Sequence, residues 1–434
     1  MTELILQAAS RVDQAELYWH RQHTIDVRFE NYALQRITQD DLSSVALRVI
    51  DRGNLGLSYG VGPKQEGLLE EAVVAAELGG RADFSFSTAR AFPSVIAYDE
   101  AAAELTSRDL VSLCEAVTAK IQRGRPDIAL IVHCQSATEH LTVETTGGVH
   151  GEHRATRLTL SFGAPVKGAG LGVYRTEAAI SPFDPPREAI EEFLEWYSWT
   201  GKTSTPKTGR LPVIIAPEAS SLLTLPLRAG LSGQAIAKGT SPLLARAGET
   251  ILSEKLTITD DPLRPEDPKS RPFDDEGVPC RTLPLVENGV MQNVLLDLHS
   301  AAELNKTSTG NGFKRSLFAS GTESPPNPWP GHVVIAPGQT PYKEMIADLE
   351  EGILLIGGMG FHSGNYTQGL FAVQAHGFHI IGGRVKGRLD RTMVAGSIYQ
   401  DFLDIGALSN ERRESPGGLA PYILVDSLQV AGRS

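Results

Sequence analysis

The stretch LPLVENGVMQNVLL, residues 283–296, carries the clearest fold signal in this sequence. Apolar residues at 283–286 and 290–296 flank Asn288-Gly289, a pair that favours the positive φ values of a tight hairpin turn. The stretch therefore predicts two antiparallel strands joined by a short turn. Further apolar runs at residues 333–336, 353–356, 370–379 and 423–431 continue the pattern. The chain beyond Ser270 is therefore expected to be mostly β.

The first half of the chain mixes helices with strands. The spacing of apolar residues predicts helices at residues 3–12, 66–78, 110–121 and 185–199. Strands are predicted at residues 15–19, 24–30, 33–37, 45–50, 55–59, 129–134, 140–146, 156–162 and 171–175. Because the two kinds of element alternate irregularly, we expect an α+β fold and not a doubly wound parallel sheet.

A polar stretch with Pro and Gly, TGKTSTPKTGR at residues 200–210, separates the two halves. Such composition is typical of a linker. We therefore expect three parts: an N-terminal mixed α/β domain with antiparallel strands at residues 1–200, a linker at residues 201–210, and a mainly antiparallel C-terminal β domain at residues 211–434.

Composition narrows the classes of function. The 434 residues include 52 acidic and 40 basic side chains, for a net charge of −12. Nucleic-acid binding needs clustered Lys and Arg, so no nucleic-acid partner is expected. The pair Arg412-Arg413 is flanked by Glu411 and Glu414, which predicts a neutral surface patch.

Three cysteines, Cys114, Cys134 and Cys280, form no CxxC pair, so neither a disulfide framework nor a structural zinc site is expected. The N-terminal residues lack the basic and long apolar regions of a signal peptide. No run approaches the 18 apolar residues of a membrane span. The sequence predicts a cytoplasmic protein with no membrane partner.

Several motifs contain residues that could hold a cofactor or a metal. The glycine-rich GMGFHSG, residues 358–364, leads into another strand, whereas a dinucleotide loop must open a helix. Two histidine pairs are spaced three residues apart, His150 with His153 and His376 with His379. Residues three apart on a strand point to opposite faces, so neither pair is expected to chelate one ion. The acidic run at residues 274–276 before Gly277 is interpreted as a solvated turn.

The second half nevertheless resembles a known family, the TldD/TldE proteins, of which TldE is also called PmbA. The resemblance spans most of residues 210–400 and rests on five stretches in order. They are LLTLPLRAGLSGQ (222–234), KGTS (238–241), RPFDDEGVP (271–279), TGNG (309–312) and GFHSGNYTQG (360–369).

The first of these stretches corresponds to a catalytic helix in TldD-like members, which carry HExxxH before a GLEG turn. Aligning GLEG with residues 230–233 places the two histidines and the glutamate at Thr224, Ala229 and Leu225. The third ligand of the family, a cysteine, falls in the glycine loop at residues 357–364, where no cysteine stands. These vacated positions resemble the TldE/PmbA branch, which implies no catalytic residue, metal or cofactor in this chain. Pro226 also predicts that a regular helix forms here only if Pro226 lies in its first turn.

The resemblance implies a metal-free subunit of a cytoplasmic TldD/TldE-type metallopeptidase, with zinc held by a TldD-like partner. Substrates would be peptides or unfolded chains. The heterodimer would form through the C-terminal domain, and self-association is expected when the chain is alone. Two alternatives stay open: an independent hydrolase with an atypical metal site built from His150, His153, His376 or His379, and a non-enzymatic peptide-binding scaffold.

The last stretch of the resemblance supplies the candidate peptide contacts. We expect residues 361–369 to line the shared cavity. The side chains expected to bond the peptide or to line its cavity are His362, Ser363, Asn365, Tyr366 and Gln368. The alternative is a glycine-rich turn region with a structural role only.

Overall fold

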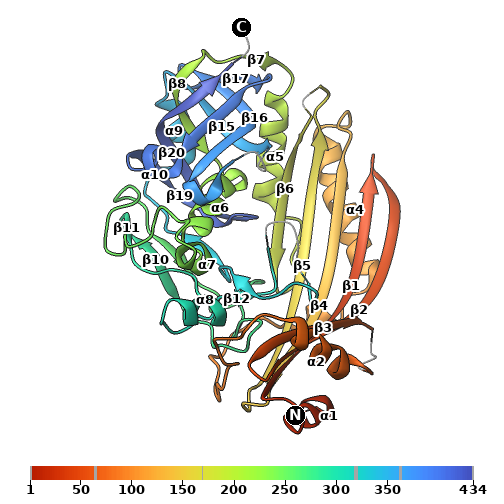
Figure 1. Ribbon diagram of the computed structural model, residues 1–434. Coiled ribbons are helices and arrows are strands. Elements are labelled where there is room, and N and C mark those ends of the chain that lie inside the picture. The colour runs from red at the N-terminus through yellow and green to blue at the C-terminus, as the bar shows by residue number, and fades with distance from the viewer. Residues whose placement is uncertain (1, 63–65, 169, 317–320, 361–363, 433–434) are drawn as a thin grey trace.

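The computed structural model describes residues 2–62, 66–168, 170–316, 321–360 and 364–432. Figure 1 shows a tall sheet formed by the N-terminal part, with the C-terminal part packed against one side of it. Helices and strands occur together in an α+β arrangement, as expected. Across the described residues, no helix combines the length and the apolar character needed to cross a membrane.

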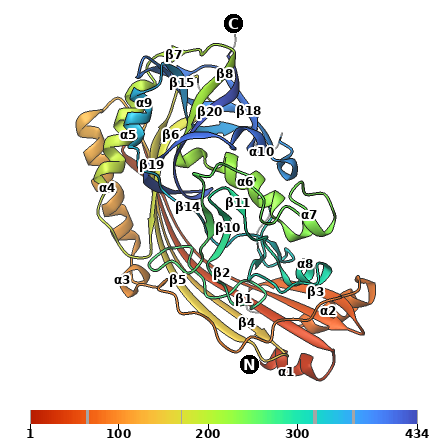
Figure 2. The ribbon, with the colours of Figure 1, turned by 90° about the vertical axis from the view of Figure 1, so that its left-hand side faces the viewer.

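The N-terminal part is a six-stranded antiparallel sheet in the order β3-β2-β1-β4-β5-β6. Its strands are β1 (Gln14–Glu30), β2 (Ala33–Asp51), β3 (Asn54–Val61), β4 (Ile131–Thr145), β5 (His150–Pro165) and β6 (Gly172–Ala179). The helices of this part are α1 (Glu3–Ala9), α2 (Leu68–Leu78), α3 (Glu100–Ala103), α4 (Ser107–Gly124) and α5 (Arg187–Trp199). Figure 2 shows the long strands curving around the C-terminal part.

Side-chain alternation along β1 explains how both faces of this sheet are covered. Leu17 packs with α1 and α2, and Val27 packs with α4. Glu16 and Tyr18, the two residues on either side of Leu17, point to the opposite face of the sheet, which meets the C-terminal part. The strand has two buried faces because each is covered by a different part of the molecule.

The strands of this sheet are longer than the sequence indicated. Residues 15–19 and 24–30 were expected as separate strands, but β1 runs unbroken between them. His20 and His23 are polar, yet both are paired with β2 on one side and with β4 on the other. Ladder hydrogen bonds on both edges therefore hold an extended backbone that local propensity does not favour.

The C-terminal part is a twelve-stranded sheet with a core path of β11-β10-β9-β14-β20-β8-β15-β16-β17-β7. Strand β18 joins β16 to β20, so β8, β15, β16, β18 and β20 close into a ring. The strands are β7 (Thr203–Ser204), β8 (Gly209–Ile215), β9 (Ile258–Asp260), β10 (Leu283–Glu287), β11 (Val290–Met291), β14 (Val333–Ile335), β15 (Glu351–Met359), β16 (Leu370–Ile381), β17 (Arg384–Leu389), β18 (Met393–Ser397), β19 (Ile405–Ser415) and β20 (Gly418–Ala431). Most pairs are antiparallel; β8 with β15, β14 with β20 and β7 with β17 are parallel.

Short helices and one small hairpin complete this part. They are η1 (Pro217–Ala219), α6 (Ser221–Gly230), α7 (Gly233–Ala237), α8 (Leu298–Glu303), α9 (Tyr342–Ala347), η3 (Tyr366–Gln368), α10 (Ile398–Asp401), and the pair β12 (Gly312–Phe313) with β13 (Asn327–Pro328). The stretch expected as a linker, residues 201–210, contains β7 and the start of β8. The domain boundary itself stays a prediction.

The hairpin at residues 283–296 forms with the expected turn, since Asn288 and Gly289 both have positive φ. Its second strand is shorter than predicted and ends at Met291. Leu295 instead pairs with the turn after α6: its N–H donates to the Leu231 carbonyl, and its carbonyl accepts from the Gly233 N–H. The second half of this stretch therefore supports α6 and does not extend the hairpin.

Candidate functional site

The main candidate site is a cavity of about 850 Å³ between the N-terminal sheet and α6. Strands β5 and β6 contribute one wall, and α5 contributes Trp196. The opposite wall comes from α6, from the end of β15 and from β19. The apolar contribution includes Leu225 and Ile356, with Gly357 and Gly358 beside them. Because both parts of the chain build it, the cavity exists only when they are docked together.

Helix α6 turns Ser221 and Leu225 toward this cavity, one helical turn apart. Thr224 is buried against the core, and Ala229 is half-buried on the last turn. The expectation about Pro226 was wrong: it is the sixth residue of this ten-residue helix, not part of the first turn. The helix continues because Leu222, Leu223 and Leu227 anchor it in the core, which outweighs one missing backbone bond.

The glycines after α6 are required by close packing. A Cβ on Gly230 would lie 2.0 Å from the Tyr399 hydroxyl, and a Cβ on Gly233 would lie 2.4 Å from Leu296. The turn therefore fixes how α6 sits against its neighbours and which side chains it presents to the cavity.

A buried ionic network lies beside the cavity and includes Arg175, one of its lining residues. The Arg175 guanidinium stacks 3.6 Å from the Trp196 ring centre and lies 3.0 Å from the Glu192 carboxylate. Glu192 also pairs with Arg413 and accepts a 2.9 Å hydrogen bond from the Tyr422 hydroxyl. Burial raises the pKa of Glu192, but Arg175 and Arg413 outweigh it, so that the net shift is downward. The expected surface patch at Arg413 is thus wrong, because partners distant in sequence draw this side chain into the protein.

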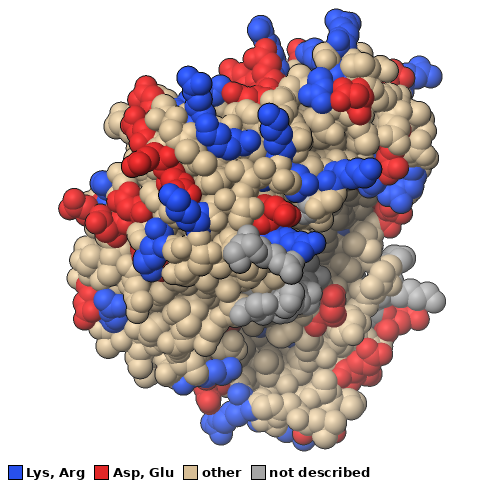
Figure 3. Space-filling view, turned by 90° about the horizontal axis from the view of Figure 1, so that it is seen from above, with Lys and Arg blue, Asp and Glu red and all other residues tan. Residues whose placement is uncertain are grey.

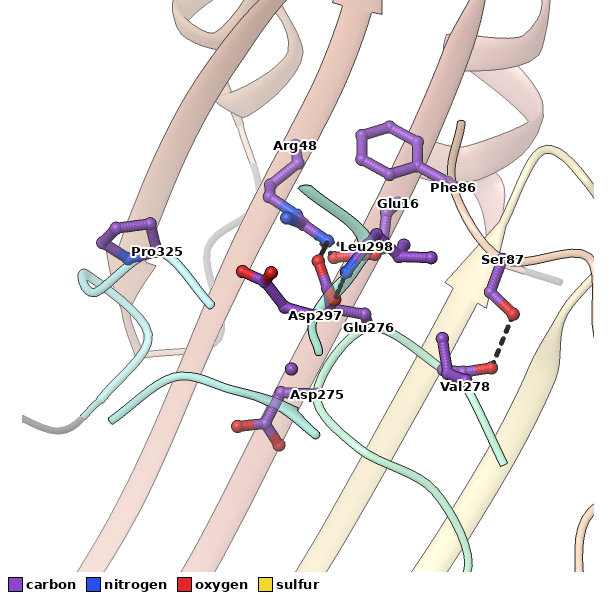
Figure 4. Close-up of polar contacts among 12 residues, drawn as sticks. Glu16, Arg48, Phe86, Ser87, Asp275, Glu276, Val278, Asp297, Leu298 and Pro325 are labelled. Carbon is purple, nitrogen blue, oxygen red and sulfur yellow. Dashed lines mark hydrogen bonds and ion pairs between the residues drawn. The ribbon is translucent and has the colours of Figure 1, made fainter. Parts of the chain in front are cut away.

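A second buried charged cluster forms around the motif at residues 271–279 (Figure 4). Arg48 on β2 binds Glu16 on β1 through two hydrogen bonds of 2.6 and 2.8 Å, and binds Glu276 at 2.9 Å. The Leu298 N–H donates to the other Glu276 oxygen at 2.7 Å. Burial is the main cause that raises the pKa of Glu276, to about 7, while Arg48 opposes the rise.

The acidic run at residues 274–276 is therefore not a solvated turn; that interpretation was wrong. Its three residues are at most 2% exposed. Asp274 accepts from the N–H groups of Glu276, Val278 and Gly312, and Asp275 accepts from Arg271 and from the Lys314 N–H. Charged side chains are buried here because each has specific donors, some from the motif itself and others from distant segments.

The comparisons with known proteins agree with this architecture. The family model described as PmbA/TldA metallopeptidase C-terminal domain matches residues 208–432, more than half of the chain. This chain belongs to the PmbA/TldD metallopeptidase family. The resemblance drawn from the sequence motifs is confirmed at that level.

Individual relatives give the same family. A metalloprotease of Methanothermobacter thermautotrophicus is 25% identical over 429 residues, covering 94% of this chain and 91% of that protein. A zinc metalloprotease TldD homolog of Saccharolobus solfataricus is 27% identical over 244 residues, about half of either chain (53% and 54%). The crystal structure of TldE from Thermococcus kodakarensis matches 99% of both chains with a TM-score of 0.89 at 24% identity, a likeness of fold.

The zinc that the family name implies does not fit the α6 positions. Thr224, Leu225 and Ala229 offer no imidazole, thiolate or carboxylate, the usual zinc donors. Within the described residues, one group of three potential ligands is close enough for a metal: Asp267, His332 and Glu414. Lys269 already binds Glu414 at 2.5 Å, and Arg264 lies 3.3 Å from Asp267. These carboxylates are thus already compensated by cations of the protein.

The histidine pairs point to opposite faces, as their spacing predicted. His150 is exposed, whereas His153 is buried on the face toward the C-terminal part. His376 lies 2.9 Å from the Gly172 carbonyl at the main cavity, whereas the His379 ring lies 2.8 Å from the Ser204 hydroxyl. Neither pair brings its two imidazoles to one point, as expected; the alternative of an atypical metal site stays a hypothesis for metal analysis to test.

The candidate peptide contacts are only partly described. His362 and Ser363 lie outside the described residues. Asn365 caps η3, and its side chain accepts from the Gln368 N–H at 3.4 Å. The Gln368 side chain donates to the Thr240 carbonyl at 2.9 Å, and Tyr366 packs against the C-terminal core. Their role toward a peptide stays a prediction.

Sequence reasoning missed the N-terminal contribution to the cavity. Thr159, Tyr174 and Thr176 line it from β5 and β6. Strand alternation could have placed these three on one face of their strands. Nothing in the sequence indicates that α6, more than forty residues later, packs opposite that face.

Proposed function

We propose that this chain is a metal-free, TldE/PmbA-like subunit of a cytoplasmic TldD/TldE-type metallopeptidase that acts on peptides or unfolded chains. One observation carries the proposal. At the place where the resemblance puts a catalytic helix, α6 presents Ser221 and Leu225 to a cavity of about 850 Å³. A helix with this position and without a metal donor is suited to shaping a site, not to performing hydrolysis.

The role assigned to this chain is to bind and orient the peptide. Leu225 and Ile356 offer apolar surface for substrate side chains. Strand β15 pairs with β8 only at residues 353–355 but follows β16 as far as Met359. Beyond Leu355 the backbone beside the cavity is therefore suited to pair with an extended peptide, as in β-strand addition. Hydrolysis itself is assigned to the zinc-bearing partner.

Location and partners are part of the same proposal. The free, buried cysteines Cys114, Cys134 and Cys280 are consistent with a reducing cytoplasm. The face of the molecule in Figure 3 carries acidic and basic side chains intermixed around a hollow, without a basic stripe. We expect the C-terminal domain to form an interface of the obligate class, above roughly 2,000 Å², with a TldD-like chain or, in its absence, with a second copy.

Metal analysis and reconstitution test the proposal. The purified chain should hold no stoichiometric zinc and show no peptidase activity. Activity should appear on mixing with a TldD-like partner that keeps HExxxH, and should vanish when that motif is mutated. The double variant Thr224→His with Ala229→His should stay inactive alone, because the glutamate base and the cysteine ligand are also missing. Metal-dependent cleavage by the isolated chain would overturn the proposal, as would one equivalent of zinc lost on mutating His376 or His379.

A further inference from the structure

A second cavity, of about 530 Å³, lies between the same face of the N-terminal sheet and the segments around the motif at residues 271–279. Strands β1, β4 and β5 supply one wall, and residues 268–271 and 313–315 supply much of the other. Arg157 and Lys269 line this cavity and also line the 850 Å³ cavity. The two spaces are therefore neighbours along one face of the sheet.

Three cations of the C-terminal part gather in this second cavity. Lys314 is 3% exposed; among the described residues its ammonium donates one long hydrogen bond, 3.5 Å to the Ser324 carbonyl, and it lies 5.4 Å from the centre of the Tyr18 ring. The guanidinium groups of Arg271 and Arg315 lie 5.1 and 5.9 Å from the centre of the same Phe313 ring. Arg315 has no ion-pair partner among the described residues. A buried ammonium with so few acceptors among the described residues is costly, and an acceptor that enters the cavity would lower that cost.

The acidic groups that line the cavity are already engaged or exposed. Asp275 binds Arg271 at 2.6 Å, and its other oxygen accepts from the Lys314 N–H. Glu139 on β4 lies 3.6 Å from Arg157 and 3.9 Å from His20. Glu323 is exposed at the rim. With Arg157 and Lys269 counted, five cations line the cavity beside these three carboxylates. Lys269 is paired with Glu414, which lies outside this lining, so the other four cations still outnumber the carboxylates and the cavity keeps an excess of positive charge.

The pKa values of the groups in the cavity reflect burial first and the nearby cations second. Burial, followed by the nearby Arg48, lowers the pKa of Lys314 to about 8. Burial, followed by Arg271, lowers the pKa of His153 to about 4. Burial raises the pKa of Glu139, but His20, Arg157 and Arg271 together lower it to about 2. At neutral pH Lys314 is therefore largely charged, and His153 adds no further charge.

We propose that this second cavity binds the C-terminal carboxylate of a peptide whose preceding residues occupy the 850 Å³ cavity. Arg271, Lys314 and Arg315 supply the donors. A guanidinium group can donate two parallel hydrogen bonds to one carboxylate, and the buried Lys314 ammonium adds a further positive charge. The inference rests on the proposed function, because it takes the neighbouring cavity to be the peptide site. It adds the direction in which the peptide binds: the C-terminal end of the peptide lies in the second cavity.

Calorimetric titration of the isolated full-length chain at pH 7 tests this. The probes are the acetylated hexapeptide Ala-Leu-Ala-Leu-Ala-Ala with a free carboxylate, its C-terminal amide, and an amide whose last residue is Glu. The free acid should bind roughly tenfold more tightly than either amide, as expected for charge-assisted hydrogen bonds. Arg315→Gln should remove most of that preference without lowering the melting temperature. The control Arg187→Gln, at a side chain that is 84% exposed, should keep it.

The other outcomes separate the two proposals. Equal binding of the acid and the plain amide would overturn the carboxylate site and leave the peptide cavity standing. Equal binding of the acid and the Glu amide would show that a side-chain carboxylate suffices, which also overturns the assignment to the chain end. Failure of all three peptides to bind would overturn both proposals.

Discussion

Helix α6 and the segment at residues 271–279 are both family motifs, and they differ in the use of charge. The α6 positions hold Thr224, Leu225 and Ala229, and the helix presents an apolar side chain to its cavity. The segment at residues 271–279 buries three carboxylates and connects them to β2 and to residues 312–314. The α6 motif lies beside a cavity but carries no metal donor at these three positions. The motif at residues 271–279 carries buried charges, and each has a partner.

The difference separates two roles that a family motif can have: shaping a cavity and joining two parts of the chain. Apolar burial at α6 tolerates exchange of side chains of similar size. The ionic cluster does not, because removing one member leaves the others buried without a partner. The predictions below test this contrast from the largest expected effect to the smallest.

Arg48→Met should produce the largest loss of stability. It leaves Glu16 and Glu276 buried and unpaired, which is expected to lower the free energy of unfolding by about 3–5 kcal/mol. Urea unfolding measures this. The matched control, Arg11→Met, breaks an exposed pair with Glu70 and should change stability by less than about 1 kcal/mol. Equal losses in the two variants would mean that the cluster does not join the two parts.

His153 should make the molecule sensitive to acid. Burial, then Arg271, lowers its pKa to about 4 in the folded protein, against an ordinary value of 6.5. Its contribution to stability is therefore complete above pH 6.5 and is lost as pH falls toward 4. The difference between the two pKa values corresponds to about 3 kcal/mol.

The variant His153→Gln should accordingly lose less stability than the unmodified chain between pH 7 and pH 4.5, as followed by urea unfolding at both values. His23→Gln, at an exposed ring paired with Asp41, serves as the control and should leave that pH dependence unchanged. Identical pH profiles for His153→Gln and the unmodified chain would contradict the assignment.

Leu225→Trp should fill part of the apolar cavity. Peptide affinity of the isolated chain should fall by at least about fivefold, since the larger ring occupies the space assigned to a substrate side chain. The melting temperature should stay within a few degrees, because Leu225 faces a cavity. The control is Leu244→Trp, the same substitution at a residue that is 49% exposed, and it should leave the peptide affinity unchanged. Unchanged affinity in Leu225→Trp would place the peptide elsewhere.

Asn365→Ala should have the smallest effect. It removes the long cap of η3 and should cost less than about 1 kcal/mol. If residues 364–369 contact the peptide, turnover by the reconstituted complex should fall while assembly is unaffected. Turnover equal to that of the unmodified complex would assign this segment a structural role only.

Local patterns predicted the kinds of element better than their extents. The hairpin at Asn288-Gly289, the α+β class and the opposite faces of His150 and His153 follow from turn chemistry and strand periodicity. The lengths of β1, β2 and β4 do not, because polar residues inside them are held by neighbouring strands. Helix α6 runs through Pro226 for a similar reason: its leucines are fixed by tertiary packing.

Sequence reasoning could predict a part of the candidate site only where all residues of that part lie close together in the sequence, within one helix or strand. The sequence resemblance pointed to the segment that forms α6; that its residues are vacated catalytic positions stays a prediction. It did not show that Asp274, Asp275 and Glu276 are buried, because their donors include Arg48 and Lys314. Nor did it indicate the cationic cavity, whose residues come from opposite halves of the chain. Partners at large sequence separation leave no local pattern from which they could be found.

The Arg48–Glu276 contact joins residues separated by 228 positions, and this has a consequence for biosynthesis. Glu16 and Arg48 are partners across β1 and β2, and all six strands of their sheet are translated before Glu276. Contacts of such separation form slowly, and larger chains of this kind fold through intermediates. An early species with an uncovered sheet face should therefore accumulate during refolding. Its lifetime would be set by the arrival of the C-terminal half.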